Sequence, residues 1–327
     1  MRENIVTFKL ASKWYGRVDT EEGPDAVRWH QKVLSAPTGC PGSTVGMLGF
    51  ACDEGVRRNK GRLGAVAGPS ALRSQLANLA WHGEGDLSVT DFGTVEVEGD
   101  ALEQAQDELA SRVAAALPSV SRLLVMGGGH ETAWGSFSGL ARLFDPTQTR
   151  IGIVNLDAHF DLRVAGEQGP SSGTPFAQIA ERYGREAFHY CCLGLARSSN
   201  TYSLFKRARA LGVSYREDQD MRVSDIPDVL NQLREFCQGL DMIYLTIDLD
   251  VLPHYQAPGV SAPAARGVEL EVVQAVIDEL KHIAGSLPQG MPLVEISELN
   301  PEFDQSGVTA KTAALLADTL LCSNRRL

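Results

Sequence analysis

The sequence predicts an α/β fold built around a mainly parallel sheet, and two observations support this class. Short apolar runs alternate with longer amphipathic stretches almost from one end of the 327-residue chain to the other. Each apolar run has the length of a strand, and each stretch between two runs is long enough for a helix. Such alternation is typical of right-handed βαβ units, in which a helix connects two parallel strands.

Strands are expected where apolar residues run together, at Val45–Ala51, Leu87–Phe92, Arg122–Met126, Ile151–Leu156, Phe188–Leu193, Gly212–Tyr215, Met242–Ile247 and Leu293–Ile296. Helices are expected between them, at Pro69–Trp81, Ala101–Leu117, Glu131–Phe144, Pro175–Tyr183, Tyr202–Leu211, Val223–Gln238, Glu269–Ala284 and Val308–Cys322. This order fits either an open sheet with helices on both faces or a closed barrel. In both, reactive groups lie at the carboxyl ends of the strands.

Composition excludes several classes of protein. Hydrophobic residues make up 43% and charged residues 22%, which is ordinary for a globular chain. The net charge of −11 repels phosphate backbones, so we expect no nucleic-acid partner. No apolar stretch approaches the roughly 18 residues of a membrane span, and the N-terminus lacks the apolar core of a signal peptide. We therefore expect no membrane partner and a cytoplasmic protein.

The alternation of elements indicates one domain over residues 45–327, with residues 1–44 as an N-terminal extension packed on it. Six cysteines are scattered without a Cys-x-x-Cys pair, so we interpret them as reduced thiols. The adjacent Cys191 and Cys192 lie in an expected strand. Neighbouring strand side chains point to opposite faces, so packing is expected there rather than a metal site.

Three of the expected strands end in side chains that bind divalent cations, namely His130, then Asp157, His159 and Asp161, then Asp248 and Asp250. Taken alone, the Asp-x-Asp pair or the Gly-Gly-Gly-His turn would indicate only a turn. Together, four carboxylates and two imidazoles exceed what one ion normally takes, and they suit two ions. Nitrogen and oxygen ligands without thiolate favour Mn²⁺. Two ions would relieve the repulsion between the carboxylates and would generate a bridging hydroxide at neutral pH.

The segments GGGHE, NLDAHFDLR, LTIDLDVLP and ISELNP resemble, in order and spacing, the ureohydrolase family of arginases, agmatinases and formimidoylglutamases. The similarity spans Val45 to the C-terminus. It implies a three-layer α/β/α arginase-like fold with eight parallel strands, and therefore not a barrel. It also implies that His130 and Asp161 bind one Mn²⁺, that His159 and Asp250 bind the other, and that Asp157 and Asp248 bridge both. Self-association into a homo-oligomer is a further expectation from the family.

Finer features resemble the formimidoylglutamase subgroup: GGGHE, SSGTPF at 171–176, APGVSAPAARG at 257–267, the basic run at 55–62 and the WYGRVDTEEGP segment. This resemblance implies hydrolysis of N-formimidoyl-L-glutamate to L-glutamate and formamide, in histidine degradation, by a metal-bridging hydroxide. Arginases and agmatinases carry a histidine in the loop after the Asp-x-His-x-Asp motif, but residues 170–175 contain none. The general acid is therefore left unassigned, with Asp161 as one candidate.

The resemblance also implies how the substrate is held. Its amidine is a planar cation with paired N–H donors, and Glu298, after the last strand, is expected to accept them. A glutamate-like substrate also brings two carboxylates into an acidic protein, and arginine binds carboxylates bidentately. The expected substrate-binding residues besides Glu298 are Arg58, Asn59, Arg62, Arg163 and Ser172. The alternatives are another ureohydrolase acting on agmatine or guanidinobutyrate, a non-catalytic metal-binding protein and, more distantly, a zinc-dependent deacetylase.

Overall fold

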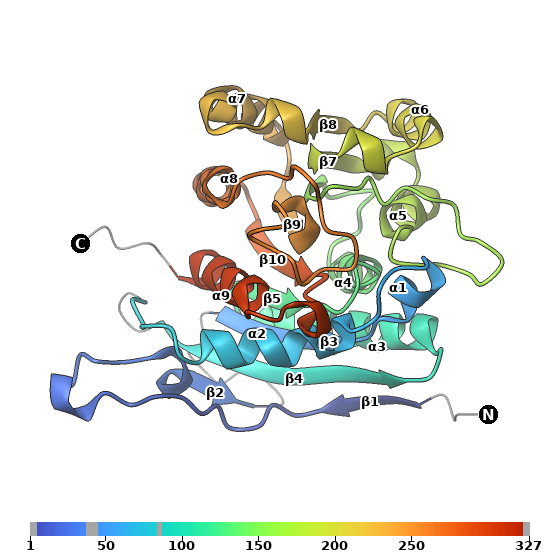
Figure 1. The fold of residues 1–327 in the computed structure, drawn as a ribbon. Coiled ribbons are helices and arrows are strands. Elements are labelled where there is room, and N and C mark those ends of the chain that lie inside the picture. The colour runs from blue at the N-terminus through green and yellow to red at the C-terminus, as the bar shows by residue number, and fades with distance from the viewer. Residues whose placement is uncertain (1–4, 37–44, 84–86, 323–327) are drawn as a thin grey trace.

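The computed structural model describes residues 5–36, 45–83 and 87–322 (Figure 1). A ten-stranded sheet has the order β1-β4-β3-β5-β10-β9-β6-β7-β8, and β2 pairs with β4 outside this path. The strands are β1 (Ile5–Lys9), β2 (Val33–Ser35), β3 (Val45–Ala51), β4 (Val89–Glu98), β5 (Arg122–Met126), β6 (Ile151–Leu156), β7 (His189–Leu195), β8 (Ser214–Glu217), β9 (Met242–Asp248) and β10 (Gly290–Ser297). β1 runs antiparallel to β4, and the other pairings are parallel. The sheet is open, so the expected three-layer class is confirmed and the barrel is excluded, but the sheet has ten strands where eight were expected.

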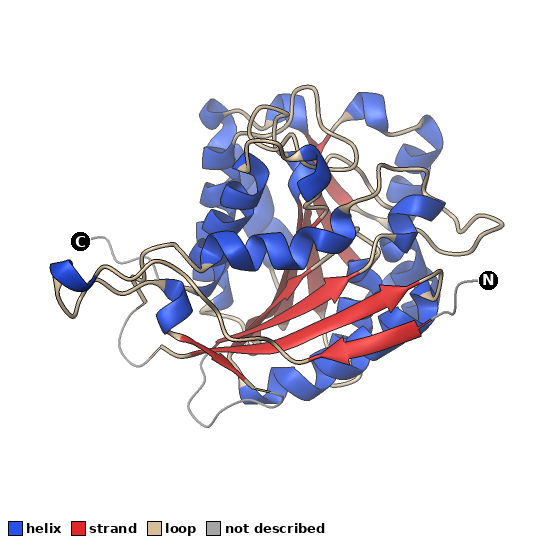
Figure 2. Ribbon diagram, turned by 60° about the horizontal axis from the view of Figure 1, so that its bottom comes forward, coloured by secondary structure: helices blue, strands red, loops and turns tan. Residues whose placement is uncertain are grey.

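Helices cover both faces of this sheet and complete three layers (Figures 1 and 2). One face carries α2 (Gly68–Leu76), α7 (Ile226–Cys237), α8 (Leu270–Ala284) and α9 (Val308–Leu321). The other carries α3 (Leu102–Ala116), α4 (Thr132–Ala141), α5 (Pro175–Tyr183) and α6 (Tyr202–Leu211). The short α1 (Glu54–Arg58) follows β3.

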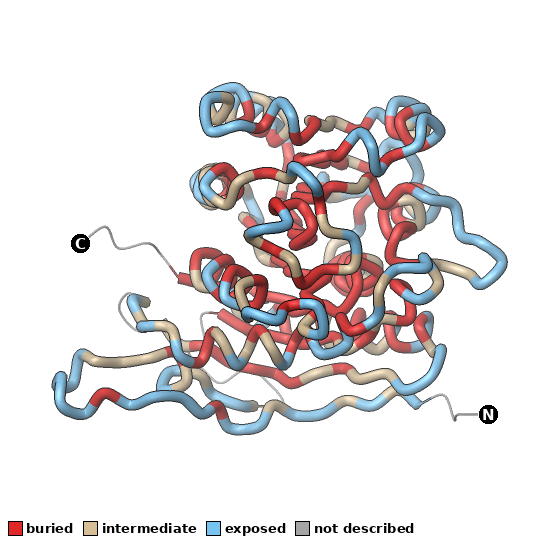
Figure 3. The backbone as a smooth tube through the Cα atoms, viewed as in Figure 1, coloured by how far each residue is buried: buried red, intermediate tan, exposed pale blue. Residues whose placement is uncertain are grey.

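Alternation of side chains along the strands divides the apolar interior into two cores, one beneath each helical layer. The central strands are mostly buried, whereas the helices alternate between buried and exposed residues (Figure 3). In β3, Met47 faces the first core and Leu48 the second. Cys191 and Cys192 likewise enter different cores, so the expectation of packing is confirmed. Cys40 lies outside the described residues.

The expected strands and helices from residue 45 onward are present, with differences at their ends. β4 continues to Glu98 rather than ending at Phe92, because its second half pairs with β1 at the edge of the sheet. There it alternates apolar and polar residues instead of forming one apolar run. α2 ends at Leu76 rather than Trp81, because the following backbone hydrogen-bonds to the N-terminal segment, including Trp29 N–H to the Leu79 carbonyl at 3.1 Å.

The N-terminal segment contributes β1 and β2, which were not expected, and two buried tryptophans. Trp14 donates from Nε1 to Asp91 Oδ2 at 2.9 Å, and Trp29 donates from Nε1 to Asp318 Oδ1 at 2.7 Å. The expected boundary between residues 44 and 45 adjoins a stretch outside the described residues, and it stays a prediction. Within the described ranges, no helix is both long and apolar enough to span a membrane.

Candidate metal centre and substrate pocket

Four neighbouring strands of the sheet, β5, β10, β9 and β6, bring the candidate residues to one edge. Because these strands are parallel, their carboxyl ends lie side by side. His130 follows β5, Glu298 follows β10, Asp248 ends β9, and the Asp157–Asp161 segment follows β6. The sequence places these residues up to 168 positions apart, and only the order of the strands makes them neighbours.

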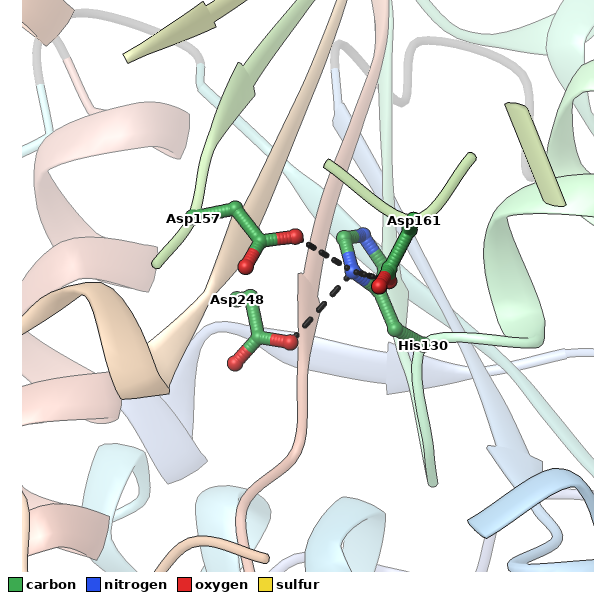
Figure 4. A group of neighbouring side chains, drawn as sticks. All are labelled: His130, Asp157, Asp161 and Asp248. Atoms are coloured by element: carbon green, nitrogen blue, oxygen red, sulfur yellow. Dashed lines mark ion pairs between the residues drawn. The ribbon is translucent and has the colours of Figure 1, made fainter. Parts of the chain in front are cut away.

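His130 lies at the centre of a buried group with Asp157, Asp161 and Asp248 (Figure 4). Its Nδ1 atom is 3.1 Å from Asp157 Oδ2, 3.0 Å from Asp161 Oδ2 and 3.3 Å from Asp248 Oδ2. Nevertheless, this buried nitrogen has no hydrogen-bond partner among the described residues. Without a cation, burial opposes protonation of His130, but the three aspartates outweigh it and raise the pKa of His130 well above its usual value. Once deprotonated, Nδ1 and the three carboxylate oxygens form a donor set that fits a divalent cation.

A second group adjoins the first and consists of Asp157, His159 and Asp250. His159 Nδ1 lies 3.0 Å from Asp250 Oδ2 and 3.5 Å from Asp157 Oδ1. Asp157 therefore belongs to both groups, with one oxygen facing each histidine. Asp248 belongs by position to the first group. The structure brings all six expected ligands together, and their roles at an ion stay a prediction.

Backbone hydrogen bonds hold these carboxylates in place. Asp157 Oδ1 accepts from the His159 N–H at 2.6 Å, and Asp248 Oδ1 accepts from the Asp250 N–H at 2.8 Å. Asp250 Oδ1 also accepts from the Ala158 N–H at 3.3 Å, which joins the ends of β6 and β9. Each Asp-x-His or Asp-x-Asp spacing thus closes a small turn that aims the remaining oxygens inward.

Burial and mutual repulsion disturb the titration of this cluster in the direction expected for crowded carboxylates without a cation. Burial, with the charge of Asp157, raises the pKa of Asp161 to about 6. Burial and the charges of Asp250 and Asp157 raise the pKa of Asp248 well above its usual value. Burial opposes ionisation of Asp157 too, but His130 and His159 outweigh it and lower the pKa of Asp157. Divalent cations would favour the ionised form of every carboxylate here.

A buried chain of polar groups reaches the far side of His130. His130 Nε2 lies 3.0 Å from Thr246 Oγ1, and Thr246 donates to Glu295 Oε1 at 3.2 Å. Glu295 is fully buried and also accepts from the hydroxyls of Tyr244 and Ser136. A hydroxyl has one proton, so Thr246 gives it to Glu295 and must accept from His130 Nε2–H. This tautomer leaves the Nδ1 lone pair facing the carboxylates.

Replacing Thr246 by valine is expected to lower the affinity for Mn²⁺ roughly tenfold to a hundredfold, because second partners of ligating histidines act on this scale. Valine matches the shape of threonine but offers no acceptor to His130 Nε2–H. Calorimetric titration of metal-free protein measures the effect, and Thr246→Ser, which keeps the hydroxyl, is the matched control. Equal affinities of the wild type and Thr246→Val would contradict this function of the hydroxyl.

Glu298 lies at the floor of a cavity of about 290 Å³ that also exposes His159, Asp161, Asp248 and Asp250. Its backbone adopts a left-handed conformation with φ of 66°, which turns the side chain into the cavity. Oε1 accepts from the His130 N–H at 2.9 Å, and Oε2 accepts from the Ser261 hydroxyl. Burial raises the pKa of this carboxyl to about 7. Each oxygen is thus fixed by one donor and retains room for another.

Only some of the expected substrate-binding residues line the cavity. Asn59, Arg62, Arg163 and Ser172 line the cavity, and Arg58 is not among its lining residues. The Arg58 side chain is 8% exposed and is engaged by Glu103 and by Glu54, whose Oε1 lies 2.9 Å from Arg58 Nε. Arg62 donates to the carbonyls of Ser261 and Val260 and lies over the ring of Phe303. The contacts of Arg58 and Arg62 are therefore those of structural arginines.

Sequence analysis did not identify Ser261, Thr246, Glu295 or Glu131 as functional residues. Glu131 Oε1 accepts from the Gly55 N–H at 2.9 Å and so ties α1 to the loop of His130. Two of these residues could have been recognised from the sequence. Glu295 is a charged residue inside an apolar run, and Thr246 shares the strand face of Asp248 two positions later. Ser261 gave no such signal, because its contact with Glu298 depends on the path of a long loop.

The sequence of the chain is similar to those of known proteins. The family model "Arginase family" matches residues 43–322. A formimidoylglutamase of Ralstonia nicotianae is 48% identical over 309 residues, which cover 93% of this chain and 92% of the relative. A formimidoylglutamase of Aeromonas salmonicida is 49% identical over 312 residues, which cover 94% and 96% of the two chains.

Solved structures share the fold. A formimidoylglutamase of Bacillus subtilis superposes with a TM-score of 0.79 at 19% identity, covering 91% of this chain and 92% of that one. A Trypanosoma cruzi formiminoglutamase solved with Mn²⁺ gives a TM-score of 0.72 at 25% identity, covering 85% and 92%. An arginase of Bacillus subtilis gives 0.72 at 23% identity, covering 86% and 100%.

Proposed function

The chain belongs to the arginase family, and from this premise we propose that it hydrolyses N-formimidoyl-L-glutamate to L-glutamate and formamide. The observation that carries the proposal is the near-half identity to formimidoylglutamases along almost the full length of both chains. The site supports it, because a buried carboxylate faces a cluster of metal-type ligands across a cavity large enough for a small amidine.

We also propose that two Mn²⁺ ions occupy the cluster in each chain. His130 Nδ1, which faces three carboxylates without a hydrogen bond, and the shared Asp157 support this assignment. His130 and Asp161 would hold one ion, His159 and Asp250 the other, and Asp157 and Asp248 would serve both. When bound, such ions would supply a hydroxide at neutral pH that can attack the amidine carbon.

The residues of the chain position the substrate for this chemistry. Glu298 would accept N–H groups of the amidinium, while Ser261 and the His130 N–H hold its two oxygens in the required orientation. The amidine carbon would then face the side of the ligand cluster that opens into the cavity, which includes Asp248 and Asp250. The buried walls exclude bulk water and strengthen each charged contact. The departing nitrogen needs a proton, and we propose that Asp161, which lines the cavity, passes to it the proton that the attacking hydroxide still carries.

A substrate panel on metal-stripped, Mn²⁺-reloaded protein tests the function. It contains N-formimidoylglutamate, arginine, agmatine and guanidinobutyrate, with glutamate and urea assayed separately. We expect metal-dependent glutamate release from the first compound and no urea from the others. Urea release would replace the proposed substrate by a guanidino compound. Two bound ions without any turnover would favour a metal-binding protein without catalytic activity.

A further inference from the structure

Three residues other than glycine have a left-handed backbone in the described part of the chain: Lys60 (φ 64°), Asp161 (φ 46°) and Glu298 (φ 66°). All three line the same cavity. Side chains with a Cβ adopt this conformation at a cost, and it persists mainly where function requires it. Asp161 and Glu298 already have proposed roles. Lys60 has none, although it has the same unusual conformation and lines the same wall.

Most cations near the cavity already have partners within the protein. Arg57 and Arg58 both pair with Glu54, and Arg62 is occupied by backbone carbonyls. By contrast, Lys60 and Arg163 are exposed, and neither side chain forms a hydrogen bond or ion pair with any residue in the described ranges. These two side chains are therefore available for an anionic ligand.

Lys60 and Arg163 come from different loops that meet at Gly173. A Cβ at Gly173 would lie 2.8 Å from Arg163 Cδ and 3.2 Å from Nδ2 of Asn59, the residue before Lys60. The Ser172 N–H also donates to the Gly55 carbonyl at 3.1 Å, which fixes the loop of Ser172 against α1. The same helix is tied to the metal-ligand loop through Glu131. The two cations are thus held on the wall that contains the metal cluster and Glu298.

We propose that Lys60, together with Arg163, binds the carboxylates of the substrate and selects amidines that carry them. This inference rests on the proposed function and adds the residues that determine its specificity. Glu298 holds the cationic end of the substrate, and the two cations hold its anionic end. Lysine supplies a mobile point charge and arginine a planar fork, so together they suit two carboxylates on a flexible chain. The left-handed backbone at Lys60 sets the direction in which its side chain leaves the loop.

Lys60→Gly separates this role from a purely structural one. Glycine accepts a positive φ without strain, so the melting temperature should stay the same or rise. The KM for N-formimidoylglutamate should rise roughly tenfold to a hundredfold, the usual loss for a charged hydrogen bond, and by more than kcat falls. Turnover of an amidine without carboxylates, N-propylformamidine, should change by less than twofold in KM. Lys60→Arg should recover most of the affinity.

The control is Lys32→Asn, which removes the charge of an exposed lysine that does not line the cavity. Its KM should equal that of the wild type. An unchanged KM in Lys60→Gly would overturn the proposal, as would equal losses for substrates with and without carboxylates.

A second experiment, calorimetric titration with L-glutamate, tests the carboxylate site independently of the proposed activity. Glutamate binding that depends on Lys60, in a protein without turnover, would retain the carboxylate site and reject the activity. Glutamate binding that does not depend on Lys60 would reject the site.

Discussion

Replacing Asp248 by asparagine is expected to abolish metal retention and turnover together. Asp248 is 3% exposed and places one oxygen 3.3 Å from His130 Nδ1, while the other accepts from the Asp250 N–H. Asparagine can keep that backbone hydrogen bond and the shape of the side chain, but it loses the charge that a bridging ligand must supply. The rate should fall roughly a thousandfold or more, since generation of the attacking hydroxide at neutral pH depends on the ions. Metal content by plasma mass spectrometry and initial rates measure the two effects.

The stability of the same variant should change in an unusual direction. In wild-type protein, each Mn²⁺ site at a hundred times its dissociation constant should add about 2.7 kcal/mol to the free energy of unfolding, which for 327 residues raises the melting temperature by roughly 4 °C per site. Asp248→Asn should lose this increase. Without metal, however, it should be at least as stable as metal-free wild type, because burial and neighbouring carboxylates already raise the pKa of Asp248.

A matched control is Asp304→Asn, at another buried aspartate whose oxygens accept from the Thr309 and Ala310 N–H groups at the start of α9. This variant should lose stability and still bind metal. An Asp248→Asn protein that retains two ions per chain at full rate would reject the proposed bridging role.

The grouping of the six candidate ligands could be predicted from sequence because they come in short motifs that immediately follow apolar strands. For Asp157, His159 and Asp161, the spacing alone places three donors at one strand end. Parallel strands then bring separate ends together without any knowledge of the side-chain packing. The periodicity of apolar residues fitted an open sheet and a closed barrel equally well. Only the resemblance to the ureohydrolase family favoured the open sheet.

Contacts between distant loops could not be predicted in this way. Arg58 was expected at the substrate, but Glu103, on α3 and 45 residues away, engages its guanidinium. Ser261 reaches Glu298 from 37 residues upstream through a loop whose path no local pattern describes. β1 and β2 were overlooked for a related reason. They are edge strands with exposed or half-exposed side chains, so they lack the apolar runs that marked the other strands.

Replacing Glu298 by glutamine is expected to lower kcat/KM by two to three orders of magnitude while the protein retains both ions. The side chain is 4% exposed, and Ser261 and the His130 N–H each donate to one of its oxygens. Glutamine would direct an NH₂ group towards one of these donors or towards the amidinium, and it removes the charge opposite a buried cation. Loss of one partner of such a pair costs roughly 3–5 kcal/mol. Rates and metal content measured on the same sample separate this effect from that of Asp248→Asn.

The pH dependence gives a second criterion for Glu298. Burial raises its pKa to about 7, and only the ionised form can accept N–H groups from the amidinium at both oxygens. Acidification should therefore weaken substrate binding as this carboxylate becomes protonated. Bound divalent cations favour the ionised form, so the acid limb of kcat/KM should lie below pH 7 in the loaded enzyme. Glu298→Gln should lack the contribution of this group at every pH. If kcat/KM of the wild type and of Glu298→Gln fell to the same extent and at the same pH on acidification, a group other than Glu298 would be responsible for the fall.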